Sequence, residues 1–493
     1  MTFEEYRNQD AIGLAELVRT GETSPIELLN IAINRLEEVN PETNAVIHKL
    51  YDFAKDSIGN IDENTVFAGV PFLMKDIGTH LKGTPMNFGC SGYKNFISTE
   101  DSLVTTKIKN AGLITFAKTN TPEFGLTLYT EPKLHGPTRN PWNLSHSPGG
   151  SSGGSASAVA SGITPIATAN DGGGSIRNPA AYCGLFGLKP SRGRVSLGNI
   201  ISESWQGAVA ENCISRSVRD SAAYLDAIIG PGSGEPFIFQ KPERSFLEET
   251  KIEPGRLKIA YSTEHTLGHE IDQECIDAVQ NTVSILKNLG HEVTEVKNPW
   301  DKNDLKIGFT TIIFGEVASE LRDLEKYLGR KVTSKDAEIN TRSMALLGNT
   351  FNSGDFAHAK KQWGRLARNI GLFHDDYDLM LTPTNATIPP KIGEQLNTKT
   401  EDKLASVITS LGLGKLLKSQ ADKIAEKTFG YTPFTPIANM TGQPSMSVPM
   451  HWSKKNLPVG VMFTGRIGED NILYRLAAQL EKTQPWFDKI PQL

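Results

Sequence analysis

A serine that follows three glycines is the residue of this chain whose surroundings most suggest chemistry. Ser175 ends the run Gly172-Gly173-Gly174-Ser175. Successive main-chain N–H groups in a glycine turn can form a concave binding site for an anion, and such donors stabilise the oxyanion of acyl transfer. We therefore interpret Ser175 as a candidate nucleophile. A flexible turn is the alternative, whereas a phosphate-binding P-loop is not supported because no Gly-Lys-Ser/Thr follows.

A second serine loop lies upstream of this turn. Residues 148–155 read PGGSSGGS and contain Ser151 and Ser152. The window 149–153 matches the pattern G-x-S-x-G of a nucleophile elbow, but an elbow requires an apolar strand directly before it. A polar segment rich in turn residues, 139–146, stands there instead. The local pattern therefore favours a loop that caps the apolar, small-residue helix after it.

A lysine at the end of an apolar run is the third candidate. Lys75 follows residues 66–74, which read VFAGVPFLM. A lysine in this place either faces solvent or is buried, and burial lowers the pKa of its ammonium group. A neutral amine beside serine hydroxyls can act as a general base. The two serine loops supply such hydroxyls, so we consider Lys75 the candidate base.

No histidine has comparable support. The ten histidines are scattered, and His146, which lies near the serine loop, is typical of a loop residue. None of them stands in H-E-x-x-H or another close metal spacing. A Ser-His-Asp enzyme is therefore the weaker interpretation, and we expect neither a metal nor a cofactor.

Composition restricts the classes of partner. The 493 residues include 38% hydrophobic and 22% charged residues, and the net charge is −5, which is ordinary for a globular protein and disfavours nucleic-acid binding. The four cysteines are far apart and include no C-x-x-C pair, as expected for buried reduced thiols. No segment reads as a signal peptide or a membrane span. We expect a cytoplasmic protein that binds neither nucleic acid nor membrane.

Apolar runs alternate with amphipathic stretches along the chain. This alternation indicates an α/β fold with a large mixed, mostly parallel central β-sheet covered by α-helices on both faces. A helix is expected at 103–109, and another after Ser24, where Ser24-Pro25-Ile26-Glu27 has the form of a capping box. The strands are expected at 66–74, 112–117, 163–169, 257–261, 378–382, 445–448 and 459–463.

The order of these segments predicts one interleaved domain over residues 1–493. Expected strands stand near both ends of the chain, so they must combine into a common sheet. Residues 231–255 are rich in Pro, Gly and charge and indicate a long surface connection. The more polar, helix-rich segment from about 300 to about 430 should cover one side of the sheet.

Several motifs together resemble the amidase signature family. They are GVPFLMKD at 69–76, GGSSGGSASAVASG at 149–162 and NDGGGSIRNPAAYCGLFGLKP at 170–190. The resemblance extends over nearly the whole chain, from about residue 15 to about residue 480, and it implies the amidase signature fold. One departure is Asn170, which stands where many members carry threonine. The amino-acid sequence of the flanking segments is most similar to that of the 6-aminohexanoate-cyclic-dimer hydrolase branch, whose members open cyclic amides.

The resemblance implies a Ser–cis-Ser–Lys triad and an acyl-enzyme. Matched by position, Ser175 is the nucleophile and Lys75 the base. Ser151 is the bridging serine, and its peptide bond to Gly150 is cis. The interval between the two serines in the family selects Ser151 over Ser152.

The resemblance also assigns supporting roles around the triad. It places the oxyanion hole at the N–H groups of Gly172, Gly173, Gly174 and Ser175. The residues expected to brace the loops are Ser152, Asp171 and Arg177.

Three functions are compared on this basis. The first is a free-standing amidohydrolase of a linear or cyclic amide. The second is the glutaminase-type component of an aminoacyl-tRNA amidotransferase, which Leu126, Leu128 and Tyr129 disfavour because they suggest an apolar pocket wall. The third is a nucleotide-binding protein without catalysis. The candidate pocket residues are Leu126, Tyr129 and Phe434, and the expected partner is a small-molecule amide. The sequence contains no pattern that identifies a subunit interface, so it leaves open whether the protein is a homodimer.

Overall fold

The sheet at the centre of the computed structural model joins early and late parts of the chain. The structure describes residues 1–493 except 415, 417–424 and 427–428. In the described part, eleven strands form one sheet in the order β1-β3-β2-β4-β6-β5-β10-β11-β9-β7-β8. The strands are β1 (Val46–Lys49), β2 (Pro71–Lys75), β3 (Ile114–Thr119), β4 (Ile166–Asp171), β5 (Phe186–Lys189), β6 (Ala210–Ser215), β7 (Lys258–Tyr261), β8 (Glu292–Glu295), β9 (Leu379–Pro383), β10 (Ser445–Trp452) and β11 (Pro458–Gly465).

The sheet is mixed, as expected, but parallel pairs do not dominate it. Parallel pairing links β2 with β3 and β4, and β7 with β8 and β9. The remaining pairs, including β4–β6, β5–β6, β5–β10 and β10–β11, are antiparallel. The central strands are buried on both faces and therefore have continuous apolar sequences, which are typical of parallel sheets. The same sequences can also form antiparallel pairs, so the pattern did not reveal the direction of the strands.

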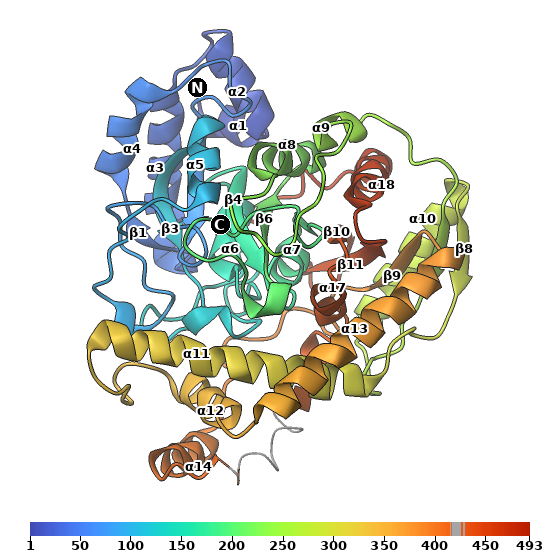
Figure 1. The fold of residues 1–493 in the computed structure, drawn as a ribbon. Coiled ribbons are helices and arrows are strands. Elements are labelled where there is room, and N and C mark those ends of the chain that lie inside the picture. Colours follow the sequence, from blue (N-terminus) through green and yellow to red (C-terminus); the bar gives the residue numbers. More distant parts are fainter. Residues whose placement is uncertain (415, 417–424, 427–428) are drawn as a thin grey trace.

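Helices cover the sheet, which confirms the predicted α/β class (Figure 1). Helices α6 and α7 contact each other and the strands beneath them, and α8 and α18 form a second contacting pair over β5, β6, β10 and β11. The α-helices are α1 (Phe3–Arg7), α2 (Ala11–Arg19), α3 (Pro25–Thr43), α4 (Tyr51–Ser57), α5 (Leu103–Asn110), α6 (Gly153–Ala160), α7 (Arg177–Cys183), α8 (Val218–Ile228), α9 (Phe246–Glu249), α10 (Gln273–Asn288), α11 (Thr310–Leu328), α12 (Ile339–Gly348), α13 (Ser353–Asp376), α14 (Lys399–Ser410), α17 (Thr435–Thr441) and α18 (Asp470–Thr483). Shorter turns are η1 (Ile58–Asn60), η2 (Ser91–Tyr93), η3 (Glu123–Gly125), η4 (Trp205–Gly207) and the π-helical η5 (Asp304–Phe309).

Helix α3 begins with the cap that was expected at Ser24, and its Glu27 has further partners. The Ser24 side chain accepts a hydrogen bond from the N–H of Glu27, as an N-cap serine should. The Glu27 carboxylate binds the N-terminal amine of Met1 and the Thr23 hydroxyl, and its contact with the N–H of Ser24 has a smaller effect on its pKa.

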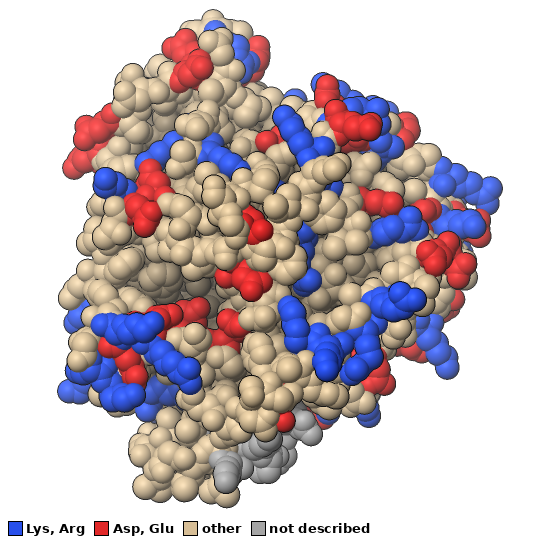
Figure 2. Space-filling model, in the orientation of Figure 1, with Lys and Arg blue, Asp and Glu red and all other residues tan. Residues whose placement is uncertain are grey.

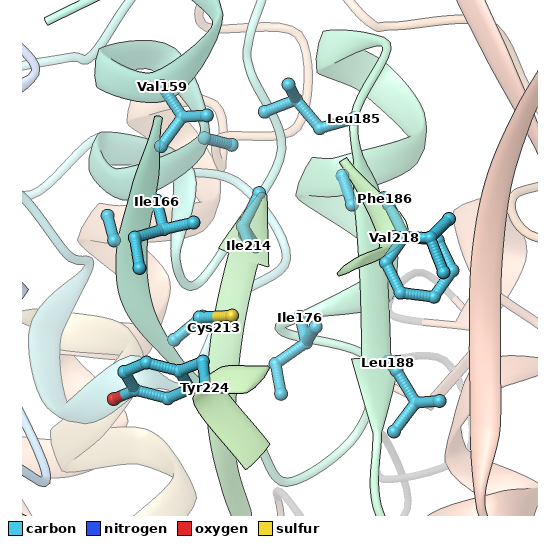
Figure 3. Packing of buried hydrophobic residues seen from close by; sticks show 14 of the residues in the cluster. Val159, Ile166, Ile176, Leu185, Phe186, Leu188, Cys213, Ile214, Val218 and Tyr224 are labelled. Atoms are coloured by element: carbon cyan, nitrogen blue, oxygen red, sulfur yellow. The ribbon is translucent and has the colours of Figure 1, made fainter. Parts of the chain in front are cut away.

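The core between the central strands and their helices fixes the loops that carry the serines. Figure 3 shows Val159 of α6, Ile166 of β4, Ile214 of β6 and Phe186 of β5, which belong to one hydrophobic cluster on both faces of the sheet. Ile176, the residue after Ser175, is fully buried in the same cluster. Burying such a side chain contributes about 2 kcal/mol, so Ile176 anchors the turn that ends in Ser175.

The segment predicted to be rich in helices, 300–430, contains α11, α12, α13 and α14 in its described part and has a small core of its own, while strand β9 of the central sheet also lies within it. Helix α11 packs against both α12 and α13 (Figure 1, yellow and orange). Phe309, Ile313, Trp363 and Phe429 belong to their apolar cluster. Residues 415, 417–424 and 427–428 of this segment lie outside the described residues.

Charged side chains of both signs lie on the face of the molecule that Figure 2 shows. No helix among the described residues is long and apolar enough to cross a bilayer. The four cysteines are free and buried, as expected.

Candidate active site

Lys75 is the last residue of β2 and is fully buried. Its Nζ donates hydrogen bonds to Ser151 Oγ at 2.8 Å and to Asn170 Oδ1 at 2.5 Å. Burial lowers the pKa of Lys75 to about 7, although the carboxyl groups of Glu211 and Asp171 oppose this change. A substantial fraction of the amine is therefore neutral near pH 7 and can accept a proton.

Ser151 lies at the start of the second serine loop and is almost fully buried. The peptide bond between Gly150 and Ser151 is cis, as the resemblance implied. The N–H of Gly150 donates to Asn178 Oδ1 at 2.9 Å. The described residues directly before Ser151 form no strand, so the G-x-S-x-G match is not a nucleophile elbow.

Ser152 and α6 hold this loop against the sheet. Ser152 is the N-cap residue of α6, but its side chain makes no capping bond and donates to Asn170 O at 3.4 Å. The small residues of α6 are all buried. A Cβ atom on Gly154 would lie 2.4 Å from the main-chain nitrogen of Asn120, so only glycine permits this close packing.

Ser175 stands in the turn between β4 and α7 and is 4% exposed. Close contacts explain the glycines before it. A Cβ atom on Gly172 would lie 2.7 Å from the Trp205 ring, and one on Gly174, where φ is +135°, would lie 2.4 Å from Thr435 Oγ1. A side chain at position 172 would therefore overlap the Trp205 ring. At position 174 a side chain would overlap Thr435, and the positive φ also favours glycine.

A buried ion pair braces the Ser175 turn. Arg177 donates two hydrogen bonds of 2.9 Å to the Asp171 carboxylate, and both side chains are fully buried. Asn439 Nδ2 also donates to Asp171 Oδ1. Burial by itself raises the pKa of Asp171, but the Arg177 guanidinium and Asn439 more than offset this and hold the pKa well below its ordinary value. The supporting positions expected for Asp171 and Arg177 agree with these contacts.

One predicted oxyanion donor is engaged elsewhere. The N–H of Gly174 donates to Asp171 Oδ1 at 2.7 Å. Its hydrogen therefore points at the carboxylate of the brace, and the expectation that Gly174 contributes to the oxyanion hole is wrong in this conformation. The N–H groups of Gly172, Gly173 and Ser175 remain as candidate donors.

Glu211 is a site residue that sequence reasoning missed. It lies directly opposite Asn170 in the β4–β6 pair and is 4% exposed. Its carboxyl group contacts the Asn170 side chain, and burial raises its pKa to about 8, although Lys75 and Asn170 oppose this change. No motif marks Glu211 because the antiparallel register, not the spacing in sequence, brings it to Lys75.

Two hollows meet at Ser175. Gly125, Ser175 and Trp205 line both of them. Leu126 lines one hollow as expected, whereas Tyr129 and Phe434 line neither. The main chain of Tyr129 lies against Gly150, and Phe434 is fully buried and lines a separate hollow. Leu128 and Pro436, which are near them in sequence, line the hollow instead.

A cluster of possible metal ligands lies outside these hollows. His48, Asp76 and His135 each bring a ligand atom to within 4.8 Å of the other two. Burial raises the pKa of Asp76 to about 7, and the nearby Lys118 ammonium opposes this change. Because a lysine of this chain supplies positive charge to the carboxyl group, we assign no metal to the cluster. Three distant segments contribute to it, so no spacing in the sequence could indicate it.

Known proteins provide an independent comparison. The amidase family model matches residues 27–473. A 6-aminohexanoate-cyclic-dimer hydrolase of Paenarthrobacter ureafaciens is 34% identical over 98% of this chain and 97% of its own length. A solved structure of 6-aminohexanoate cyclic dimer hydrolase complexed with substrate has a TM-score of 0.90 at 34% identity and covers 99% of both chains. A solved component of the glutamyl-tRNA(Gln) amidotransferase of Thermotoga maritima has a TM-score of 0.73 at 28% identity, over 98% of this chain and 95% of its own.

Proposed function

Because this chain belongs to the amidase family and hydrolyses amide C–N bonds, we propose that Ser175, Ser151 and Lys75 carry out that hydrolysis as a Ser–Ser–Lys triad. The observation that carries this proposal is the 2.8 Å hydrogen bond from Lys75 Nζ to Ser151 Oγ in a buried site. A lysine amine that is partly neutral near pH 7 and contacts a serine hydroxyl has the properties of a general base.

The first half of the reaction forms an acyl-enzyme. Ser175 Oγ attacks the amide carbonyl carbon while its proton passes to Ser151 Oγ, and the Ser151 proton passes to Lys75 Nζ. The tetrahedral intermediate then collapses as the C–N bond breaks. The same two groups return a proton to the leaving nitrogen, so that the amine departs neutral and Ser175 remains acylated.

The second half of the reaction repeats these steps with water. Water attacks the acyl ester as Ser151 and Lys75 accept its proton, and the C–O bond to Ser175 breaks as the proton returns to Ser175 Oγ. Main-chain N–H groups of Gly172, Gly173 and Ser175 are the donors proposed for the oxyanion in both halves. Loss of one such donor typically raises the barrier by about 3 kcal/mol.

We propose a small amide, linear or cyclic, as the substrate, and the cyclic dimer of 6-aminohexanoate is the first compound to assay. The support is the likeness to a hydrolase that bears this name, at 34% identity with a TM-score of 0.90. The amidotransferase alternative has weaker support, since the corresponding values are 28% and 0.73. Leu126 and Leu128 give the hollow an apolar wall, which does not suit the charged α-carbon end of glutamine.

A cytoplasmic location is part of the proposal. All four cysteines are free and buried, as is usual in a reducing compartment. Fractionation of the native cells checks this location, and recovery of the protein outside the cytoplasm would contradict it.

Replacement of the nucleophile tests the proposed function. The Ser175→Ala variant should lose amide hydrolysis by about 10⁴-fold or more, because loss of a triad serine removes most of the catalysis. The matched control is Ser152→Ala, a buried serine of the neighbouring loop that we place outside the triad, and it should lose far less. Circular dichroism confirms that both variants are folded. Retained hydrolysis in folded Ser175→Ala would overturn the proposal.

A further inference from the structure

The two hollows that meet at Ser175 differ in chemistry. The smaller one is called the acyl hollow here, and its lining residues include Leu126, Leu128, Phe309, Ile313, Phe314 and Phe429. These described lining residues include no charged side chain. Their contact with a bound molecule favours an apolar group of several carbon atoms.

The larger hollow is called the amine hollow here. Part of its wall is apolar, with Phe88, Phe124 and Ile201 among the lining residues, but it also contains acidic and amide side chains that the acyl hollow lacks. Ser151, Asn170 and Glu211 line it on the side of the sheet, and Glu320 of α11 lines it on the other side. Figure 2 shows the molecule hollowed above α11, with acidic side chains at the margin.

Glu320 makes no ion pair with a described residue. Burial raises its pKa to about 7, and part of this change comes from the neighbouring carboxyl groups of Asp323 and Glu316. A cation bound in the amine hollow would relieve this mutual repulsion among carboxyl groups, whereas an anion would increase it.

The path of the proton determines which part of the substrate each hollow binds. The leaving nitrogen must receive its proton from Ser151, which Lys75 contacts. Ser151 lines the amine hollow and is not among the residues that line the acyl hollow. The nitrogen of the scissile amide must therefore point toward the amine hollow, which leaves the acyl hollow for the carbonyl side of the substrate.

We propose that this enzyme prefers amides with an apolar acyl chain, bound in the acyl hollow, and with an amine part that carries a positive charge, bound beside Glu320. This inference rests on the proposed function. Helix α11 determines both preferences, since Ile313 near its start lines one hollow and Glu320 in its middle lines the other.

Three substrates test the two preferences separately. N-Hexanoyl-1,5-diaminopentane combines an apolar acyl chain with a cationic amine part. N-Acetyl-1,5-diaminopentane changes only the acyl chain, and N-hexanoylpentylamine changes only the charge. The wild-type kcat/KM should be highest for the first compound.

Two variants then assign each preference to its hollow. Ile313→Ala should lower the hexanoyl-to-acetyl ratio of kcat/KM by about tenfold, because a few methylene contacts in an apolar pocket discriminate to about this degree. It should leave the preference for the charged amine unchanged. Glu320→Gln should lower the cationic-to-neutral ratio by a similar factor without changing the acyl preference. Glu325→Gln, on the same helix but paired with Lys331 at the surface, should change neither ratio.

The outcomes separate the inference from the proposed function. If Ile313→Ala changes the amine preference or Glu320→Gln changes the acyl preference, the orientation is reversed and the inference is wrong. Ratios that neither variant changes would also overturn it. In both cases the wild type would still hydrolyse amides and be labelled at Ser175 by a fluorophosphonate. Absence of both hydrolysis and labelling would instead contradict the proposed function.

Discussion

At the residue scale, the site depends on an amine that contacts two polar oxygen atoms inside the protein. Lys75 Nζ lies between Ser151 Oγ and Asn170 Oδ1. A carboxylate in direct contact would keep the amine charged, but Asp171 is occupied by Arg177, and burial keeps much of Glu211 protonated near pH 7 by raising its pKa to about 8. The arrangement therefore favours the neutral base.

The pH dependence of catalysis reports this base directly. Since burial lowers the pKa of Lys75 to about 7, the ammonium form prevails below that pH and the active amine above it. We expect kcat/KM to rise about tenfold per pH unit below pH 7 and to level off above it. Lys75→Arg should be inactive throughout, because arginine keeps its proton. A rise that begins only near pH 10 would contradict this prediction.

Asn170→Asp provides a second test of the role of the Lys75 amine as the base. An aspartate here would place a carboxylate where the Asn170 amide oxygen now contacts Lys75 Nζ at 2.5 Å. An opposite charge at this distance favours the ammonium form, so the acid limb of the pH profile should move up by about one unit or more. Asn170→Ala, as control, should lower kcat without such an upward shift. An unchanged limb in Asn170→Asp would show that Lys75 is not the titrating base.

The candidate triad could be predicted from the sequence, whereas its surroundings could not. Glycine turns and a lysine after an apolar run are local signals, and the family resemblance joined them. Glu211 depends on the register of β4 with β6. The places of Tyr129 and Phe434 depend on the packing of distant loops. Such contacts between segments far apart in the chain leave no pattern in a single sequence.

At the scale of elements, the turn between β4 and α7 depends on the Asp171–Arg177 pair. Removing one partner of a buried ion pair typically costs about 3–5 kcal/mol, because the other charge is left buried and alone. Arg177→Met should lower the free energy of unfolding by this amount in urea denaturation. Lys326→Met, which breaks an exposed ion pair with Asp323, should cost about 0.5 kcal/mol or less.

A double variant distinguishes charge from packing at this turn. If the isolated charge of Asp171 causes the loss, Asp171→Asn combined with Arg177→Met should recover part of the stability. A double variant less stable than Arg177→Met alone would contradict this explanation.

The elements themselves were predictable where their patterns are local. The strand expected at 163–169 is β4 (Ile166–Asp171), and the helix expected at 103–109 is α5 (Leu103–Asn110). The run 66–74 becomes a strand only from Pro71, since Gly69 has a φ of +77° and belongs to the preceding turn. The direction of each strand depends on its connections, which apolar runs do not encode.

At the scale of the whole molecule, the sheet explains how a distant segment completes the site. Strand β10, from the last tenth of the chain, pairs with β5, which follows the Ser175 turn and α7. Asn439 of α17, just before β10, binds both Asp171 and Arg177. The C-terminal segment is therefore part of the active-site structure and not an appendage.

At this scale we predict that the enzyme is active without a partner protein. The two hollows and the proposed triad are complete within one chain, so the purified protein should hydrolyse small amides without any other protein. Steady-state kinetics at several protein concentrations checks this. Hydrolysis of glutamine that appears only after addition of the other amidotransferase components would favour the alternative function instead.

The identity of the nucleophile is the central claim, and covalent labelling measures it most directly. The purified chain is treated with a fluorophosphonate, its intact mass is recorded, and the modified peptide is sequenced by mass spectrometry. We predict a single adduct on Ser175 that is absent from Ser175→Ala and forms more slowly in Lys75→Ala. An adduct on Ser151, Ser152 or another residue, or undiminished labelling of Ser175→Ala, would contradict the account.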